Sequence, residues 1–340
     1  MKVTRQPKNP GPAAWAKILP EAAHHPTLED DLHVDFVIIG GGFAGLTAAR
    51  RISELEPTAT VAVVEAFRLA EGPAGRNSGF MIDLPHDLAS DDYGGQAARD
   101  HQSIRHNRAA ISYAADMVAT LGLPQDCFQK IGKINAAATD RGIAHNQGYQ
   151  EHLTHLNEPF EILDDRKMHE LTGITFYKQG LFTPGAVMLQ PAQYIQSLGA
   201  AIVSNRVSIY ENSPVTDLDK VGGMWRAETA KGAISAPTVI LATNGLAQAF
   251  GFYKSRVVHI YTYASMTRAL SADEVQRLGG ASNWGFTPAD PLGTTVRRIS
   301  GIGGDRIVIR NRATYEPRLS PSERRLRGVY AQHEIGRAHV

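Results

Sequence analysis

Residues 36–45 read FVIIGGGFAG and decide how the first part of the chain folds. The apolar run 36–39 has no polar alternation, which is typical of a parallel strand covered on both faces. A glycine turn follows at once, and apolar side chains then recur at helical spacing until Pro57 ends the helix. The pattern predicts a strand, a tight turn and a helix. The positions predicted to face inward are Leu46, Ala49, Ile52 and Leu55.

A second apolar run, residues 61–64, ends in Glu65 and completes a nucleotide-binding pattern. Gly40 allows the chain to turn sharply, Gly42 leaves room for a pyrophosphate, and Gly45 lets the helix pack close to the strand. The helix N-terminus offers free N–H groups to phosphates, and Glu65 can accept hydrogen bonds from ribose hydroxyls. An acid there repels a 2′-phosphate and argues against NADP. The predicted contacts are Gly40, Gly42, Phe43, Ala44, Gly45 and Glu65.

Residues 71–80, EGPAGRNSGF, resemble a loop of the D-amino-acid oxidase/glycine oxidase superfamily of flavoenzymes. In that family a small-residue loop ending in Arg-Asn-x-Gly runs under the flavin pyrophosphate and along the isoalloxazine ring. The likeness implies that the cofactor is FAD and that an arginine supplies positive charge to the pyrophosphate. The residues that match are Arg76, Asn77, Ser78 and Gly79.

Three later segments also resemble that family. Residues 180–194 resemble its entry into a helix, and residues 207–215 resemble the strand and turn whose backbone binds adenine. Residues 239–245, VILATNG, resemble the strand that returns beside the first one. The cofactor contacts implied by these matches are Val215, Thr243, Asn244 and Gly245. A return strand so far along the chain implies that another domain is inserted, which favours FAD over a simple NAD dehydrogenase.

The expected fold class is α/β. A Rossmann-like FAD-binding domain with a mostly parallel sheet, discontinuous in sequence, carries an inserted α+β substrate domain with an antiparallel sheet. An extended arm spans 1–34, the FAD-binding domain 35–122 and 186–256, and the substrate domain 123–185 and 257–319. Helices are predicted over 94–120, 141–156, 164–171 and near 271–278, and strands over 128–138, 257–268 and 292–312, the last split by a glycine hairpin turn at 301–304.

Candidate substrate-side residues are Tyr261, Tyr263, Arg297 and His86. The two tyrosines share one face of a predicted strand because they are two residues apart. In the resembling family an arginine and one or more tyrosines hold a substrate carboxylate over the flavin. Cross-strand packing explains the tyrosines equally well, and an exposed strand charge or a solvated loop residue remains the alternative for Arg297 and His86.

The resemblance implies oxidation of an amine or amino acid at a CH–NH bond, with greatest likeness to the glycine/D-amino-acid and γ-glutamylputrescine oxidoreductases. A 2-hydroxy-acid oxidoreductase and a non-catalytic flavin or nucleotide-binding module remain alternatives.

The composition excludes several other classes of function. The formal charge of +1 gives no pull towards nucleic acid or a membrane surface. The thirteen histidines fall in no zinc-like frame, so we expect no metal. A single cysteine, Cys127, fits a reducing compartment and an inert buried side chain, and a cytoplasmic protein with no membrane insertion is expected.

The end of the chain carries two further expectations. Residues 320–334 predict the start of an amphipathic helix, and the resembling family continues beyond this point, so we expect a C-terminally truncated chain. Residues 335–340, IGRAHV, are what the common short-read sequencing adapter encodes in one frame, and are expected to be a sequencing scar.

Overall fold

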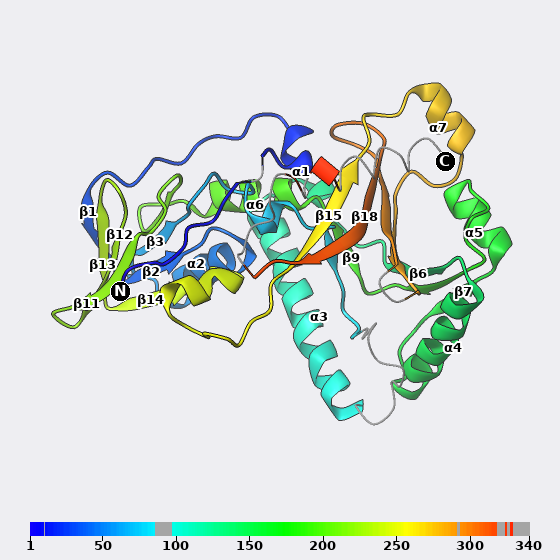
Figure 1. Ribbon diagram of the computed structural model, residues 1–340, viewed down its shortest axis with the longest axis horizontal. Helices are drawn as coiled ribbons and strands as arrows, with labels where there is room; N and C mark the ends of the chain where they lie inside the picture. Colours follow the sequence, from blue (N-terminus) through cyan, green and yellow to red (C-terminus); the bar gives the residue numbers. More distant parts are fainter. Residues whose placement is uncertain (10, 86–96, 291–292, 318–323, 325–326, 329–340) are drawn as a thin grey trace.

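The computed structural model describes residues 1–340 except 10, 86–96, 291–292, 318–323, 325–326 and 329–340. Figure 1 shows two regions side by side along the long axis of the molecule, with the long helix α3 between them. The predicted helix over 320–334 falls largely outside the described residues, and residues 335–340 lie outside them entirely.

Four short strands form a parallel sheet in the first region. Their order is β10-β3-β2-β14, and each neighbouring pair runs parallel. The bounds are Phe36–Ile39 for β2, Val61–Val64 for β3, Val207–Tyr210 for β10 and Thr238–Leu241 for β14. Val239 pairs with Val37, which confirms that residues 239–241 return beside the first strand.

Both faces of the parallel sheet are covered. Ile38 faces a core shared with α2 (Phe43–Leu55), α6 (Pro191–Ile202) and the end of α3 (Ala97–Thr120). Val37 faces the opposite core, under a second sheet. Leu46 and Ala49 are buried as predicted, but Leu55 is 59% exposed, so its predicted inward position is wrong. Leu55 is the last residue of α2, where the helix no longer faces the sheet.

The second sheet of this region has the order β1-β13-β12-β11, with β1 parallel to β13 and the other pairs antiparallel. The bounds are Asp31–His33 for β1, Asp217–Val221 for β11, Met224–Glu228 for β12 and Ala233–Ala236 for β13. No strand of this sheet is predicted from the sequence. The N-terminal residues, expected to be extended, contribute β1 and a short helix, α1 (Ala14–Lys17).

A seven-stranded mixed sheet, in the order β15-β18-β17-β16-β6-β8-β7, forms the second region. The strands are β6 (Lys133–Ala137), β7 (Glu161–Leu163), β8 (Gln179–Thr183), β15 (Ile260–Met266), β16 (Trp284–Pro288), β17 (Thr295–Ile299) and β18 (Arg306–Tyr315). All its neighbours are antiparallel except β16 and β6. The turn at 301–304 joins two antiparallel strands, which confirms the predicted hairpin.

The helices of this region are α4 (Asp140–His155), α5 (Asp165–Thr172) and α7 (Ala272–Leu278). The side chain of Asp164 accepts a hydrogen bond from Lys167 N at 2.8 Å, and Gly173 adopts φ +78° just beyond α5, as the sequence predicts. The predicted strand over 128–138 is interrupted, because Gly132 adopts φ +72° between β5 (Phe128–Gln129) and β6.

A small three-stranded sheet joins the two regions in the order β4-β9-β5, with β4 at Phe80–Met81 and β9 at Val187–Leu189. Short 3₁₀ turns span Pro73–Gly75 (η1), Gln125–Cys127 (η2) and Asn244–Phe250 (η3). Within the described part of the chain, no helix combines the length and the apolar character needed to cross a bilayer.

Candidate functional site

The carboxyl ends of β2, β3, β10 and β14 lie at one edge of the parallel sheet, since all four strands run in the same direction. Polar or glycine-rich residues follow these strand ends: Gly40 to Gly42, Glu65 and Glu211 come directly after their strands, and Thr243 comes two residues after the last residue of β14. Ligands of open α/β sheets bind in the crevice outside this edge. The topology therefore brings together segments far apart in sequence.

The three motif glycines play different structural parts. A Cβ at Gly45 would lie 1.8 Å from Gly40 O, so only glycine lets α2 approach the turn this closely. Gly40 adopts φ +112°, which favours glycine. A Cβ at Gly42 would meet only Ala74 Cβ, at 3.4 Å, and otherwise points into open space beside the first turn of α2. This opening is the cradle predicted for a pyrophosphate.

Two carboxylates stand at neighbouring strand ends. Glu65 accepts hydrogen bonds from Gly41 N at 2.7 Å and Phe67 N at 3.1 Å. Burial raises the pKa of Glu65 despite these bonds, and the nearby charge of Glu211 adds to the rise. Glu211 is buried and accepts from Leu69 N at 2.6 Å and His25 N at 3.1 Å.

The segment after β14 borders the first strand. Ala242 N donates to Ile39 O at 2.8 Å, which holds residues 242–245 beside the glycine turn. The buried hydroxyl oxygen of Thr243 has no hydrogen-bond partner in the described structure. Asn244 adopts φ +50°, and a Cβ at Gly245 would lie 2.6 Å from the His259 ring. Residues 243–245 therefore leave one unsatisfied polar group at the strand ends.

Residues 71–80 form a tightly bonded loop. Asn77 Oδ1 accepts from Gly79 N at 2.8 Å, and Gly79 O accepts from Leu189 N at 2.6 Å. Arg76 Nε donates to Glu71 O at 2.6 Å, and its Nη2 donates to Asn9 Oδ1 at 2.8 Å and to Gly11 O. The Arg76 guanidinium thus bonds to the N-terminal residues as well as to its own loop.

Arg297 packs against this loop. Its side chain is 5% exposed, and its Nη1 donates to Ser78 O at 2.9 Å and Leu189 O at 2.7 Å. The guanidinium carbon lies 5.2 Å from the centre of the Trp15 ring and 5.7 Å from that of Phe80. Burial lowers the pKa of Arg297 to about 10, so it stays charged at neutral pH. Its Nε has no partner in the described structure.

The two tyrosines lie further along the large sheet. Tyr263 is buried, and its hydroxyl lies 2.7 Å from Thr314 Oγ1, while Tyr261 is half-buried and burial raises its pKa. Arg297 pairs with Val308 and Tyr263 with Arg312, four residues further along β18, which is about 13 Å at the usual rise per residue. The structure thus separates Arg297 from the tyrosines. His86 lies outside the described residues.

A buried lysine lies on the same face of the large sheet as Arg297. The Nζ of Lys133 donates to Asn135 Oδ1, and Thr287 Oγ1 donates to that same oxygen at 2.7 Å. Burial lowers the pKa of Lys133 to about 7, and the charge of Asp83 opposes this shift. Lys133 is not predicted as a site residue, because a single lysine in a strand is typical of an exposed charge.

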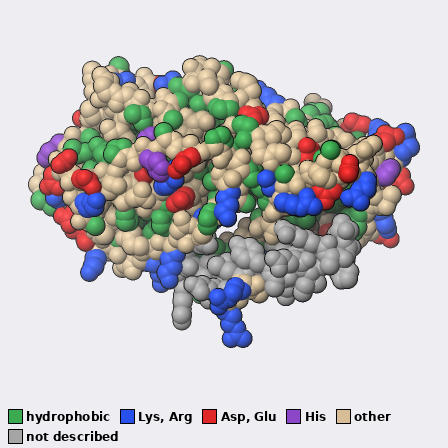
Figure 2. Space-filling model, turned by 90° about the horizontal axis from the view of Figure 1, so that it is seen from above, with side chains coloured by type: hydrophobic (Ala, Val, Ile, Leu, Met, Phe, Trp, Pro, Cys, Tyr) green, Lys and Arg blue, Asp and Glu red, His purple; other side chains and the backbone are tan. Residues whose placement is uncertain are grey.

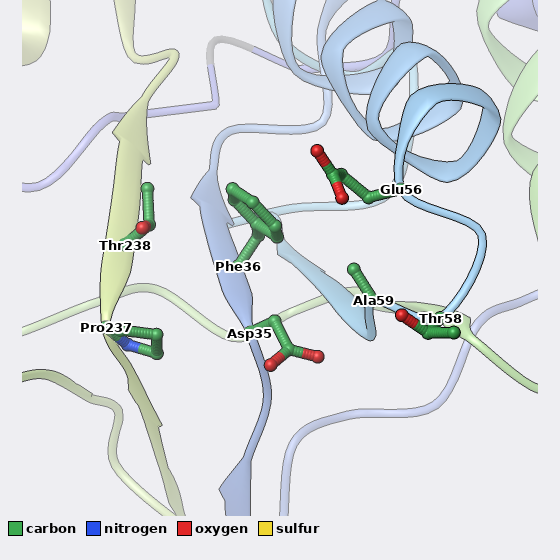
Figure 3. A pocket seen from close by; sticks show the side chains of 7 residues that line it. All are labelled: Asp35, Phe36, Glu56, Thr58, Ala59, Pro237 and Thr238. Carbon is green, nitrogen blue, oxygen red and sulfur yellow. The ribbon is translucent and has the colours of Figure 1, made fainter.

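One surface pocket lies away from the crevice. Figure 3 shows a pocket formed by Asp35, Phe36, Glu56, Thr58, Ala59, Pro237 and Thr238. Asp35 precedes β2 and Thr238 begins β14, so this pocket is at the amino edge, opposite the glycine turn. In Figure 2 basic and acidic side chains are interspersed on the visible face.

The residues at the carboxyl edge fit a dinucleotide such as FAD. The open side of Gly42 offers space beside free helix N–H groups for a pyrophosphate. The Glu65 carboxylate can accept from ribose hydroxyls, and the Thr243 hydroxyl is a buried group in need of a partner. Sequence reasoning missed Glu211 and Trp15. Glu211 had a signal, an acid directly after an apolar strand, as at Glu65.

Comparison with known proteins agrees with this geometry. The DAO family, described as FAD dependent oxidoreductase, matches residues 35–332. The probable oxidoreductase OrdL of Haemophilus influenzae is 29% identical over 223 residues, which cover 64% of this chain and 51% of that protein. The γ-glutamylputrescine oxidoreductase of Escherichia coli is 26% identical over 222 residues, covering 64% and 50%. The chain thus spans about half the length of the curated relatives that it matches.

Among solved structures, glycine oxidase from Geobacillus kaustophilus superposes with a TM-score of 0.65 at 18% identity, covering 84% of this chain and 73% of that one. This likeness confirms the predicted fold class.

Proposed function

Since this chain belongs to the DAO family of FAD-dependent oxidoreductases, we propose that it holds FAD at the carboxyl edge of the parallel sheet and oxidises a CH–NH bond of an amine or amino acid. The glycine turn, Glu65 and Thr243 lie together at the carboxyl edge of the parallel sheet, and this arrangement supports the proposal most strongly. The amine specificity is supported by similarity to proteins named γ-glutamylputrescine oxidoreductase and glycine oxidase.

Each part of the edge has a role in the proposed site. The open side of Gly42 and the N-terminus of α2 receive the pyrophosphate, and Glu65 accepts from the adenosine ribose. The backbone of Val215 and the segment from Thr243 to Gly245 border the remaining nucleotide. Residues 76–79 run along the ring, held in one conformation by the Asn77 side chain.

The chain's own residues determine the electrostatics of the proposed reaction. FAD, when bound, supplies the acceptor for the hydride that leaves the substrate carbon. Arg297 places a desolvated positive charge at Ser78, where it attracts negative charge on the ring or on a substrate carboxylate. Tyr261, which pairs with Thr314 and so lies about 20 Å from Arg297 along the sheet, is proposed to bind a more distant part of the substrate. The substrate carbon would lose a hydride and its nitrogen would lose a proton to water, which would leave an imine that water hydrolyses to a carbonyl compound and ammonia or an amine.

Anaerobic titration of the FAD-loaded chain tests the function. Amines, amino acids and 2-hydroxy acids are added in turn, and loss of the flavin band at about 450 nm is followed. Bleaching by an amine with release of ammonia or a smaller amine supports the proposal. Bleaching only by 2-hydroxy acids without ammonia favours CH–OH oxidation, and no bleaching by any substrate favours a binding module.

The compartment is a separate proposal. We propose a cytoplasmic protein, on the ground that Cys127 is a free thiol and that the one cysteine can form no disulfide within the chain.

A further inference from the structure

The N-terminal residues 1–9 and 11–30, called the arm below, follow the carboxyl edge of the parallel sheet. In Figure 1 the arm runs from the N-terminus to α1 and then back towards β1. It precedes the residues that match the family, which begin at 35. Its hydrogen bonds show which strand ends it passes.

The arm is bonded to the segment after β10. Glu211 N donates to Pro26 O at 3.0 Å, and Leu28 N donates to Ser213 Oγ at 2.9 Å. Gln6 Nε2 donates to Val215 O at 2.8 Å, from the outgoing part of the arm. The part of the arm that runs towards α1 and the part that returns towards β1 therefore both bond to the segment after β10. This segment includes Val215, the residue implied to border adenine.

The segments after β3 and β14 are bonded to the arm as well. Arg68 Nη2 donates to Ala22 O at 3.2 Å, and Asn9 Nδ2 donates to Glu71 Oε2 at 3.1 Å. Thr4 N donates to Ala249 O at 3.0 Å. The segments that follow three of the four strands are thus bonded to the arm.

Trp15 fixes the arm to the loop proposed to lie along the ring. Its Nε1 donates to Asn77 O at 2.9 Å, and its carbonyl oxygen accepts from Gln190 Nε2 at 3.0 Å. The indole ring is buried beneath the Arg297 guanidinium. Trp15 is therefore placed to hold the loop and Arg297 in position.

The arm leaves the opening at Gly42 unfilled, although Asn9 and Gly11 accept hydrogen bonds from Arg76, the arginine that the family resemblance places near the pyrophosphate. None of the hydrogen bonds described for the arm reaches residues 40–45, and a Cβ at Gly42 would meet only Ala74. The Glu65 carboxylate accepts hydrogen bonds from the backbone N–H groups of Gly41 and Phe67, which do not belong to the arm. An arm that blocked the site would occupy these groups.

The geometry points to a retaining role: we propose that the arm is a strap of the cofactor site that slows the release of bound FAD, with Trp15 as a positioning residue. This inference rests on the proposed function, because it requires that the crevice binds FAD. The strap holds the segments after three strand ends at fixed separations, so the dinucleotide leaves only when several anchors open together.

The test compares wild type with the triple variant Gln6→Ala, Asn9→Ala, Trp15→Phe. These changes remove three anchors on the arm and keep an aromatic ring beneath Arg297. His24→Ala is the matched control, since it removes an exposed side-chain contact with Glu21 within the arm. Release of FAD is followed by the rise in flavin fluorescence after dilution, and circular dichroism of the apo forms verifies folding. We expect release about ten-fold faster, because each anchor stabilises the closed arm modestly, with uptake and the control unchanged.

Trypsin supplies a readout independent of release. Lys8 is exposed in the arm, and saturation with FAD is expected to slow cleavage after it in the wild type. Equal rates of FAD release from wild type and a folded triple variant would refute the strap and leave the proposed function intact. Cleavage at Lys8 at the same rate with and without FAD would do the same. Faster uptake and tighter binding by the variant would show that the arm competes with FAD. A folded wild type that binds no FAD refutes both proposals.

Discussion

Substitutions at two glycines of one motif are expected to affect different properties: Gly42→Val should mainly weaken FAD binding, and Gly45→Ala should mainly lower the stability of the fold. In Gly42→Val the new Cβ lies 3.4 Å from Ala74 Cβ, an ordinary contact, and φ of −87° suits any residue. Gly42 is the N-cap of α2, where a branched apolar residue costs about 1 kcal/mol of unfolding free energy. The added methyl groups occupy the cradle, so FAD affinity should fall at least about 100-fold, or about 2.7 kcal/mol.

In Gly45→Ala the Cβ would lie 1.8 Å from Gly40 O and 3.3 Å from Ile38 Cγ2. Helix α2 must shift away from β2, which should cost at least about 3 kcal/mol. Thermal unfolding of the apo proteins by circular dichroism should give a Tm lowered by roughly 2 °C for Gly42→Val and by roughly 6 °C or more for Gly45→Ala. Titration with FAD then measures affinity. Wild-type FAD affinity in Gly42→Val would refute the cradle, and equal loss of Tm in both would refute the packing argument.

Three further outcomes are expected. Glu65→Ala should weaken FAD binding by about 1–3 kcal/mol in the same titration, since the ribose hydroxyls lose their acceptor; unchanged affinity would place the ribose elsewhere. Arg297→Met should lower the apo Tm, because Ser78 O and Leu189 O lose their hydrogen-bond donor, and should also lower the flavin reduction potential in dye-coupled titration, because a buried positive charge is removed; a lower Tm with the same potential would make Arg297 purely structural. The pKa of Lys133 is about 7 when folded against an ordinary 10.5, so the unfolded chain binds more protons between these values and the unfolding free energy rises with pH. Urea unfolding of Lys133→Met from pH 7 to 10 should lack that rise, and an identical slope would show that Lys133 does not titrate there.

The burial of Cys127 illustrates a prediction made from composition alone. The thiol is fully buried, and burial raises its pKa to about 12, so it is unreactive at neutral pH. Its neighbours in the core are apolar, although residues 125–130, QDCFQK, are mostly polar.

The sequence determined the features that a short stretch of chain encodes by itself. The unit from residue 36 to Glu65, the caps of α5 at Asp164 and Gly173, and the hairpin at 301–304 follow from burial patterns and backbone dihedral preferences within one or two elements. The partnership of β14 with β2 is not local, and only the family resemblance predicted it.

Only the tertiary structure decided where the long side chains of the site find partners. Arg76 bonds to Asn9, 67 residues away, and Arg297 bonds to Ser78, 219 residues away. An arginine in a loop or strand can reach solvent, phosphate or a carbonyl with similar ease, and its own sequence neighbours do not distinguish these. The partners are set when the two regions and the arm pack together, because a buried guanidinium is stabilised by hydrogen bonds to the acceptors that packing has placed nearby.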